Sequence, residues 1–330
     1  MKFKALISLA LVFVLFCLCS CEQTLEAPKF SKVNILVYGN DYANNPKGKI
    51  GNATGTASSL LGTINDATQV GLALEALAEK AGVECSATYV TGKNYTIKGR
   101  YRTKISYVPE EKSDHDTTKA HFRELMGHLA ESSTANELTI IFFSCHGFNM
   151  GKDVKQSYTG NSNSSKTSFV MSGTSSSDTF ELYTHKEFKE DLAAIKGTKV
   201  VFADVCYSGG LVDPTNVAIN TDEYTGTEEI SLYWGDYTLT KDPSTFFLTA
   251  SRYYEQSYET DTREHGVFTV LLLDALGWDE ENQQITKTSG TITFFDLCQD
   301  VAKNNKYSTL NPQTPMLTSG SNDVILFELN

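Results

Sequence analysis

The sequence predicts an α/β domain with a mostly parallel central sheet and helices on both faces. Short runs of apolar and β-branched residues recur along the chain, and segments with a helical spacing of apolar residues lie between them. The run at 137–144 (ELTIIFFS) is apolar at almost every position, as strands covered on both faces are. Alternating strands and helices form βαβ units, whose helices cover both faces of a parallel sheet.

The first part of the domain predicts two strands and two helices. The segment 33–39 (VNILVYG) is apolar, β-branched and closed by a glycine, which is typical of a buried strand. In 64–82, alanine and leucine residues fall on one side of a helix, and Gly82 is suited to end it. Residues 83–90 predict a second strand, and residues 117–131 predict a second amphipathic helix.

The middle of the chain predicts a polar loop followed by a helix. Residues 161–178 are rich in serine, threonine and asparagine, which indicates an exposed, mobile loop. In the helix expected at 184–197, Thr184 and Glu187 form a capping box and Gly197 ends the helix.

The remaining elements continue the alternation. They are strand-like runs at 198–204, 244–251 and 323–329 and helical segments at 266–277 and 293–305. Because no internal repeat or second linker interrupts the pattern, residues 33–330 are expected to form one domain.

The N-terminus predicts export and a lipid anchor. Residues 1–20 have a basic start with Lys2 and Lys4 and continue as an apolar run of the length of a signal-peptide core. The run ends in LCSC, which resembles a bacterial lipobox; cleavage would leave Cys21 to carry the lipid and 21–32 as a tether. The expected location is the periplasmic or cell-surface side of a bacterial membrane. Cys19 is unusual for the motif, so an unlipidated secreted form is the alternative.

Composition excludes one class of partner. The chain has 330 residues, 40% of them hydrophobic and 21% charged, and a net charge of −12. Because phosphate binding needs a basic face, a nucleic-acid partner is not expected. The cysteines after the signal segment show no CxxC pair and no zinc spacing, although an even number leaves two disulfides open. They are Cys85, Cys145, Cys206 and Cys298.

Two strand ends carry residues suited to nucleophilic catalysis. The strand within 137–144 runs into SCHG, which places His146 there, and the strand at 198–204 runs into VCYSGG, which places Cys206 there. An imidazole near a thiol generates the thiolate that attacks a carbonyl. Gly147 and the glycine pair 209–210 would let backbone N–H groups approach a developing oxyanion.

The alternative for any single cysteine or histidine is a structural role. A buried cysteine is usually a small core residue, and a lone histidine is usually a hydrogen-bonded one. This interpretation is preferred for Cys85 and Cys298, which lie inside predicted elements. It is weaker for His146 and Cys206, because both follow a strand.

Four segments together resemble the caspase-like cysteine peptidases, and metacaspases in particular. FFSCHG and DVCYSGG look like the two catalytic motifs, TINDA (63–67) resembles the family's G-x-x-N-D-A segment, and NPQTPMLTSGS (311–321) resembles its Q-x-P segment. They occur in the family's order and cover most of 33–330. The resemblance implies a caspase-like sandwich fold and a cysteine endopeptidase.

The resemblance also implies a role for each matching residue. His146 and Cys206 correspond to the catalytic dyad, with the oxyanion held by backbone near Gly147 and Cys206. Asp66, Ser144 and Asp204 correspond to residues that line the specificity pocket. Two acids in that pocket imply polypeptide substrates with arginine or lysine before the scissile bond, since a cation would pair with them.

Two departures from the motifs concern the residues beside the dyad. Cys145 stands where the family usually has glycine; a neutral substitution is expected, and a disulfide with Cys206 that silences the enzyme is the alternative. Tyr207 replaces a common histidine, which should leave the chemistry intact.

Neither a cofactor nor a metal is required for the chemistry. Metacaspases often need calcium, and the acidic segment 220–237 offers suitable carboxylates, but without EF-hand spacing a solvated loop is preferred. Lys152, Lys155 and Lys166 lie between the catalytic motifs and would suit self-cleavage after a basic residue.

Two rival functions remain open. Within the enzymes, a clostripain- or gingipain-like peptidase shares the dyad and the basic specificity. Outside them, a non-catalytic lipid-anchored surface protein could retain the caspase-like fold for binding.

Overall fold

The computed structural model describes most of the predicted domain. The described residues are 30–42, 49–50, 60–92, 112–149, 167–173, 179–211, 244–252, 255–262, 264–305, 313–318 and 324–329. The predicted signal peptide, Cys21, most of the tether, the acidic segment 220–237 and the three candidate self-cleavage lysines lie outside these residues. Within the described residues, no helix combines the length and hydropathy needed to span a membrane.

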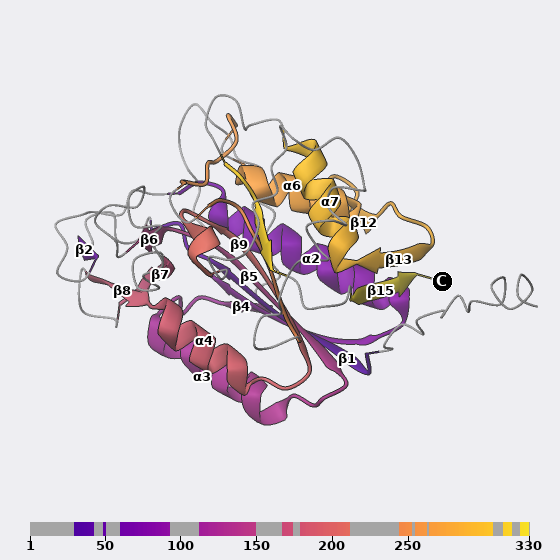
Figure 1. Ribbon diagram of the computed structural model, residues 1–330, viewed down its shortest axis with the longest axis horizontal. Coiled ribbons are helices and arrows are strands. Elements are labelled where there is room, and N and C mark those ends of the chain that lie inside the picture. The colour runs from indigo at the N-terminus through magenta and orange to yellow at the C-terminus, as the bar shows by residue number, and fades with distance from the viewer. Residues whose placement is uncertain are drawn as a thin grey trace, which may run out of the picture.

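A twisted sheet of seven described strands forms the centre of the molecule (Figure 1). In spatial order the strands are β14 (Met316–Thr318), β10 (Thr245–Thr249), β9 (Thr198–Val205), β5 (Glu137–Cys145), β1 (Lys32–Gly39), β3 (Glu84–Thr91) and β4 (Ser113–Asp114). All neighbours pair in parallel except β10 and β14, which pair antiparallel. Since β5 and β9 are neighbours in register, their carboxyl ends meet at one edge.

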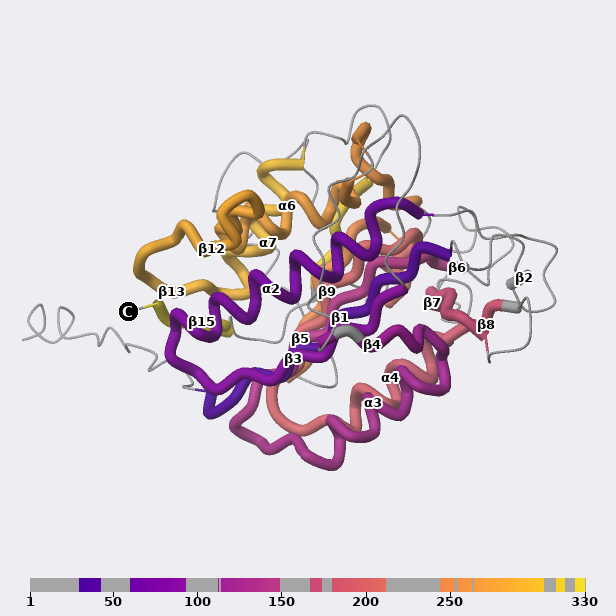
Figure 2. Tube along the Cα trace, turned by 180° about the vertical axis from the view of Figure 1, so that it is seen from behind, coloured from indigo at the N-terminus to yellow at the C-terminus, as the bar shows by residue number. Residues whose placement is uncertain are grey.

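Helices cover both faces of this sheet. One face carries α2 (Thr63–Ala81), α6 (Val267–Leu276) and α7 (Phe294–Asn304), and the other carries α3 (Lys119–Ser132) and α4 (His185–Ala194). The view from behind shows the same two layers, with α2 lying along the strands (Figure 2). The α/β class with a mostly parallel sheet and helices on both faces is therefore confirmed.

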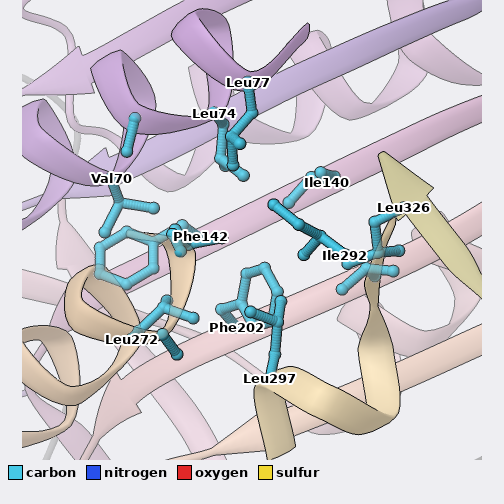
Figure 3. Close-up of a cluster of buried hydrophobic side chains, with 14 of the residues drawn as sticks. Val70, Leu74, Leu77, Ile140, Phe142, Phe202, Leu272, Ile292, Leu297 and Leu326 are labelled. Atoms are coloured by element: carbon cyan, nitrogen blue, oxygen red, sulfur yellow. The ribbon is translucent and has the colours of Figure 1, made fainter. Parts of the chain in front are cut away.

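Alternation along the strands builds a separate core on each face. In β1, Val33, Ile35 and Val37 pack on the α2 side, while Leu36 and Tyr38 pack on the α3 side, because successive strand side chains point to opposite faces. Figure 3 shows the first core, where Val70 and Leu74 of α2 face Phe142 of β5 and Leu272 of α6. The burial of each such side chain stabilises the folded protein by about 1.5–3 kcal/mol.

Smaller strands extend the fold at its ends. A second sheet contains β2 (Lys49–Ile50), β8 (Thr179–Tyr183), β7 (Thr167–Ser172) and β6 (Gly147–Asn149), and two further pairs join β11 (Trp278–Asp279) to β12 (Gln284–Ile285) and β13 (Gly290–Thr293) to β15 (Ile325–Leu329). The strand expected at the C-terminus thus exists, but it pairs with β13 outside the main sheet.

Two local predictions are wrong in part. The loop expected at 161–178 contains β7, because Phe169, Val170 and Met171 are fully buried against the α3–α4 face. The α4 helix ends at Ala194, before Gly197, which instead occupies the turn into β9 with φ +79°. The capping box of α4 and the left-handed Gly82 at the end of α2 are as predicted.

Candidate active site

The two candidate catalytic residues follow neighbouring strands. The register pairs Ser144 with Asp204 and Cys145 with Val205, so His146 and Cys206 come next on the two chains. Both are partly exposed, whereas the strand residues before them are buried. A parallel sheet gathers ligand-binding residues at this carboxyl edge.

Gly147 allows the two chain segments to approach each other. A Cβ added to Gly147 would lie 2.0 Å from the backbone oxygen of Cys206 and 2.6 Å from Cγ1 of Val205. Real Cβ atoms do not approach so closely, so this position requires glycine for steric reasons. The backbones after His146 and at Cys206 are therefore in contact.

Tyr42 positions His146. The His146 N–H donates to the Tyr42 hydroxyl at 2.9 Å, and the two rings lie 4.7 Å apart between centroids. The same hydroxyl donates to the backbone oxygen of Val170 at 2.6 Å. Tyr42 is buried, so its ring forms a fixed wall beside the imidazole. Nothing in the sequence motifs indicated this residue.

The Cys206 thiol faces Ser257. Its sulfur lies 3.6 Å from the Ser257 backbone oxygen and 4.0 Å from the Ser257 hydroxyl. Burial raises the pKa of the Cys206 thiol; the hydrogen bonds with Ser257 oppose this, and the charge of Asp204 adds to it. The thiol is therefore protonated at neutral pH, and a base must remove its proton before it can attack.

The turn after Cys206 is held by backbone hydrogen bonds. Tyr207 has φ +63°, and its N–H donates to the oxygen of Glu255 at 2.7 Å. The N–H groups of Gly209 and Gly210 donate to the oxygens of Ser251 and Tyr207. The expectation that this glycine pair serves an oxyanion is therefore wrong, because both N–H groups already donate to backbone oxygens of the chain.

The three predicted pocket residues form a buried cluster. The Ser144 hydroxyl donates to Oδ2 of Asp66 at 2.7 Å, and the Gly266 N–H donates to both Asp66 oxygens at 3.1 and 3.2 Å. Gly266 also contacts Asp204, since an added Cβ would lie 2.1 Å from its Oδ2. Asp66 and Asp204 are 1% and 5% exposed. The structure thus brings together Asp66, Ser144 and Asp204.

Asp204 contacts the beginning of α6. Its Oδ2 accepts the Thr269 N–H at 3.0 Å and the Thr269 hydroxyl at 2.9 Å. Burial and, after it, the nearby charge of Asp66 raise the pKa of the Asp204 carboxyl to about 7, although the hydrogen bonds from Thr269 oppose the rise. Two carboxylates this close cannot both be ionised without cost unless a positive group is present.

His265 supplies a positive group that the sequence analysis missed. Its Nδ1 lies 2.8 Å from Oδ1 of Asp66, and its Nε2 lies 3.0 Å from Oε2 of Glu280. Burial alone would lower the pKa of the His265 imidazole, but hydrogen bonds to the two carboxylates outweigh it and raise the pKa to about 10. The only signal in the sequence was a histidine directly before the first turn of a predicted helix.

Hydrogen bonds of Glu255 and Gln313 connect the C-terminal segment 311–321 to the loop at 255–258. Glu255 accepts the Thr314 N–H at 2.8 Å and the Arg252 N–H at 3.2 Å, and the Gln313 side chain accepts the Tyr258 N–H at 2.9 Å. The segment that resembles Q-x-P therefore anchors the loop that carries Ser257.

The four cysteines among the described residues are free, and these residues contain no metal cluster. Cys85, Cys145, Cys206 and Cys298 form no disulfide in this structure, and Cys145 is 3% exposed within the α3-side core. The described part of the chain holds no group of three or more side chains suited to a metal ion. The acidic segment considered for calcium lies outside that part.

The comparisons with known proteins identify similar structures and no family. No family model matches the sequence, and no curated protein matches it significantly. Among solved structures, protein GSU0716 from Geobacter sulfurreducens is similar, with 15% identity, a TM-score of 0.50 and coverage of 88% of this chain and 94% of that chain. Caspase-1 from Spodoptera frugiperda is also similar, with 11% identity, a TM-score of 0.45 and coverage of 90% and 91%. At such identity, the likeness to GSU0716 concerns the fold alone.

Proposed function

We propose that this chain is a caspase-like cysteine endopeptidase that cleaves polypeptides after arginine or lysine. The observation that carries the proposal is the placement of a thiol and an imidazole on neighbouring strand ends, directly beyond a buried acidic cluster. The sequence resemblance assigns the same residues to the same roles.

In the proposed mechanism, His146 removes the proton of the Cys206 thiol, and the thiolate attacks the scissile carbonyl carbon. The carbonyl oxygen becomes an oxyanion beside the backbone at Gly147 and Cys206. His146 then protonates the departing amine as the C–N bond breaks, which leaves a thioester on Cys206. Water, deprotonated by His146, attacks the thioester and releases the acid and the free thiol. No cofactor takes part in these steps.

The proposed selectivity comes from the cluster of Asp66, Ser144 and Asp204. A guanidinium or ammonium group that reaches Asp204 would favour its ionised form, because a nearby opposite charge lowers a carboxyl pKa. Substrate binding and ionisation of the pocket are then linked. We also propose that the protein is exported and held at a bacterial membrane by lipid on Cys21.

The alternative is a lipid-anchored binding protein without peptidase activity. One observation favours it, because both acids already have partners within the chain. Asp66 is hydrogen-bonded to Ser144 and His265, and Asp204 is hydrogen-bonded to Thr269. A binding protein could use these contacts to brace α6 against the sheet. A clostripain- or gingipain-like peptidase would share the dyad and differ in its sequence motifs.

The test is hydrolysis of fluorogenic peptides that end in arginine, lysine or aspartate. The assay compares a soluble protein of residues 22–330 with its matched Cys206→Ala variant. Both are assayed under reducing conditions, with and without calcium. Turnover of the basic peptides that vanishes in the variant is expected. A folded, reduced protein that cleaves none of the three and does not react with a basic chloromethyl ketone would favour the binding protein.

A further inference from the structure

His265 is enclosed by acidic side chains from two different elements. Asp66 of α2 contacts one ring nitrogen and Glu280, in the turn after β11, contacts the other. His265 is 6% exposed, and its pKa of about 10 means that the ring carries a positive charge at neutral pH. A buried imidazolium held between two carboxylates is a fixed internal cation.

The charge of Asp66 is therefore matched within the chain. Its Oδ1 meets His265, its Oδ2 meets the Ser144 hydroxyl, and the Gly266 N–H approaches both oxygens. A substrate cation would have to compete with this complete set of donors to pair with Asp66. That competition is unfavourable, because each donor it displaced would lose a buried partner.

The hydrogen-bond partners of Asp204 differ from those of Asp66. The contacts of its Oδ2 are the amide and hydroxyl of Thr269, and both are neutral donors. Asp204 also lies two residues before Cys206, at the register position opposite Ser144. It is the pocket carboxyl on the strand that delivers the nucleophile.

Building on the proposed peptidase activity, we infer that His265 is a specificity-determining residue. Its imidazolium holds the charge of Asp66, so the acidic cluster selects a basic side chain through Asp204 alone. The motif resemblance implied two carboxylates acting together on the substrate. His265 reduces the effective negative charge of the pocket by one and so sets how strongly it prefers cations over neutral side chains.

The experiment measures binding to the catalytically silent Cys206→Ala chain, so it does not depend on turnover. Benzamidine and the neutral, similarly shaped benzamide are titrated by calorimetry at mildly alkaline pH, above the pKa of about 7 of the Asp204 carboxyl. The preference for benzamidine is compared among the parent chain, His265→Gln and Asp204→Asn. Glutamine is chosen because it retains a donor for Asp66 and loses the charge.

His265→Gln is expected to increase the preference for benzamidine roughly fivefold, the effect of removing one like charge from a partly screened site. Asp204→Asn is expected to abolish the preference. An unchanged or weaker preference in His265→Gln, or no benzamidine binding by any variant, would overturn the inference. Selective benzamidine binding without peptide cleavage by the native chain would instead count against the peptidase and leave the role of His265 supported.

A second measurement covers the case in which His265→Gln does not fold. The imidazole signals of His265 are followed by NMR in the Cys206→Ala chain, with and without saturating benzamidine. The inference requires imidazolium signals at neutral pH in both states. A neutral His265 ring in either state would overturn it.

Discussion

The sulfur of Cys206 lies 3.6 Å from the backbone oxygen of Ser257 and 4.0 Å from its hydroxyl. The Ser257 side chain also opposes the rise in the pKa of the Asp204 carboxyl. One side chain thus connects the candidate nucleophile to the candidate pocket. The loop that carries Ser257 is fixed in turn by Glu255 and Gln313.

The first prediction concerns the ionisation of Cys206. Because burial raises the pKa of its thiol and the Ser257 hydroxyl opposes the rise, Ser257→Ala should move the pKa further upward. Alkylation by iodoacetamide, followed by mass spectrometry of the Cys206 peptide as a function of pH, measures the midpoint. Ser257→Thr, which retains the hydroxyl, is the control and should restore it. A lower midpoint in Ser257→Ala would contradict the arrangement.

The second prediction separates positioning of His146 from stability. Tyr42→Phe leaves the His146 N–H and the Val170 oxygen without their shared partner, which should cost about 1–3 kcal/mol of stability. It should also lower kcat on arginine peptides roughly tenfold with little change in KM, since the imidazole loses its fixed orientation.

Tyr38→Phe is the matched control for that experiment. Tyr38 is also buried, and its hydroxyl donates to the oxygen of Thr117 at 2.9 Å and accepts the Asn40 side chain at 3.3 Å, whereas the His146 N–H donates to Tyr42. Tyr38→Phe should lower the free energy of unfolding by a similar amount and leave kcat unchanged. Equal losses of kcat in the two variants would show that Tyr42 acts only through the fold.

The sequence predicts the main sheet well for a physical reason. Strands such as β5 are buried on both faces, so their residues are apolar almost without interruption, and the helices between them keep one apolar side. The strand β7 is not predicted from the sequence, because its three apolar residues (169–171) lie within a serine-rich segment. In the structure, Phe169 of β7 stacks on Phe143 of β5 with 3.9 Å between the ring centroids. The sequence around β7 does not reveal this contact between distant residues.

The candidate site is predicted unevenly for a related reason. Residues on strand ends, such as His146 and Cys206, can be placed because parallel strands share one edge. Tyr42, Ser257 and His265 reach the site from loops and a helix start. The bond between His265 and Asp66, for example, joins residues that are 199 positions apart in the sequence. Such pairing leaves no periodic signal.

The third prediction concerns stability and pH. A group whose pKa is higher in the folded than in the unfolded protein stabilises the fold below its unfolded pKa, and loses this effect as pH rises through the folded pKa. For His265 that window runs from about 6.5, the usual histidine value, to the folded value of about 10. The free energy of unfolding should therefore fall across this alkaline range.

Urea unfolding at a series of pH values measures this fall. In His265→Gln the decline between these two values should be smaller by an amount on the order of a few kcal/mol, because about 1.4 kcal/mol corresponds to each pKa unit. Asp204, whose pKa is raised to about 7, gives a separate decline at lower pH, which Asp204→Asn should remove. An identical alkaline decline in His265→Gln and in the parent chain would rule out a charged His265.

The fourth prediction concerns the approach of the two catalytic segments. Gly147→Ala places a Cβ within 2.0 Å of the Cys206 backbone oxygen, and neither backbone can move without shifting its strand. The variant should lose stability and, in the fraction that remains folded, most of its kcat, because a displacement of the nucleophile by 1 Å can cost about a hundredfold.

Gly127→Ala provides the matched control, since the same substitution in α3 meets nothing within 4 Å. It should stabilise the protein by about 1 kcal/mol through helix propensity and leave turnover unchanged. Thermal unfolding and peptide hydrolysis measured on both variants separate the outcomes. If Gly147→Ala cleaved arginine peptides at the parent rate, the contact between Gly147 and Cys206 would not be needed for the chemistry, and the placement of the dyad would have to be reconsidered.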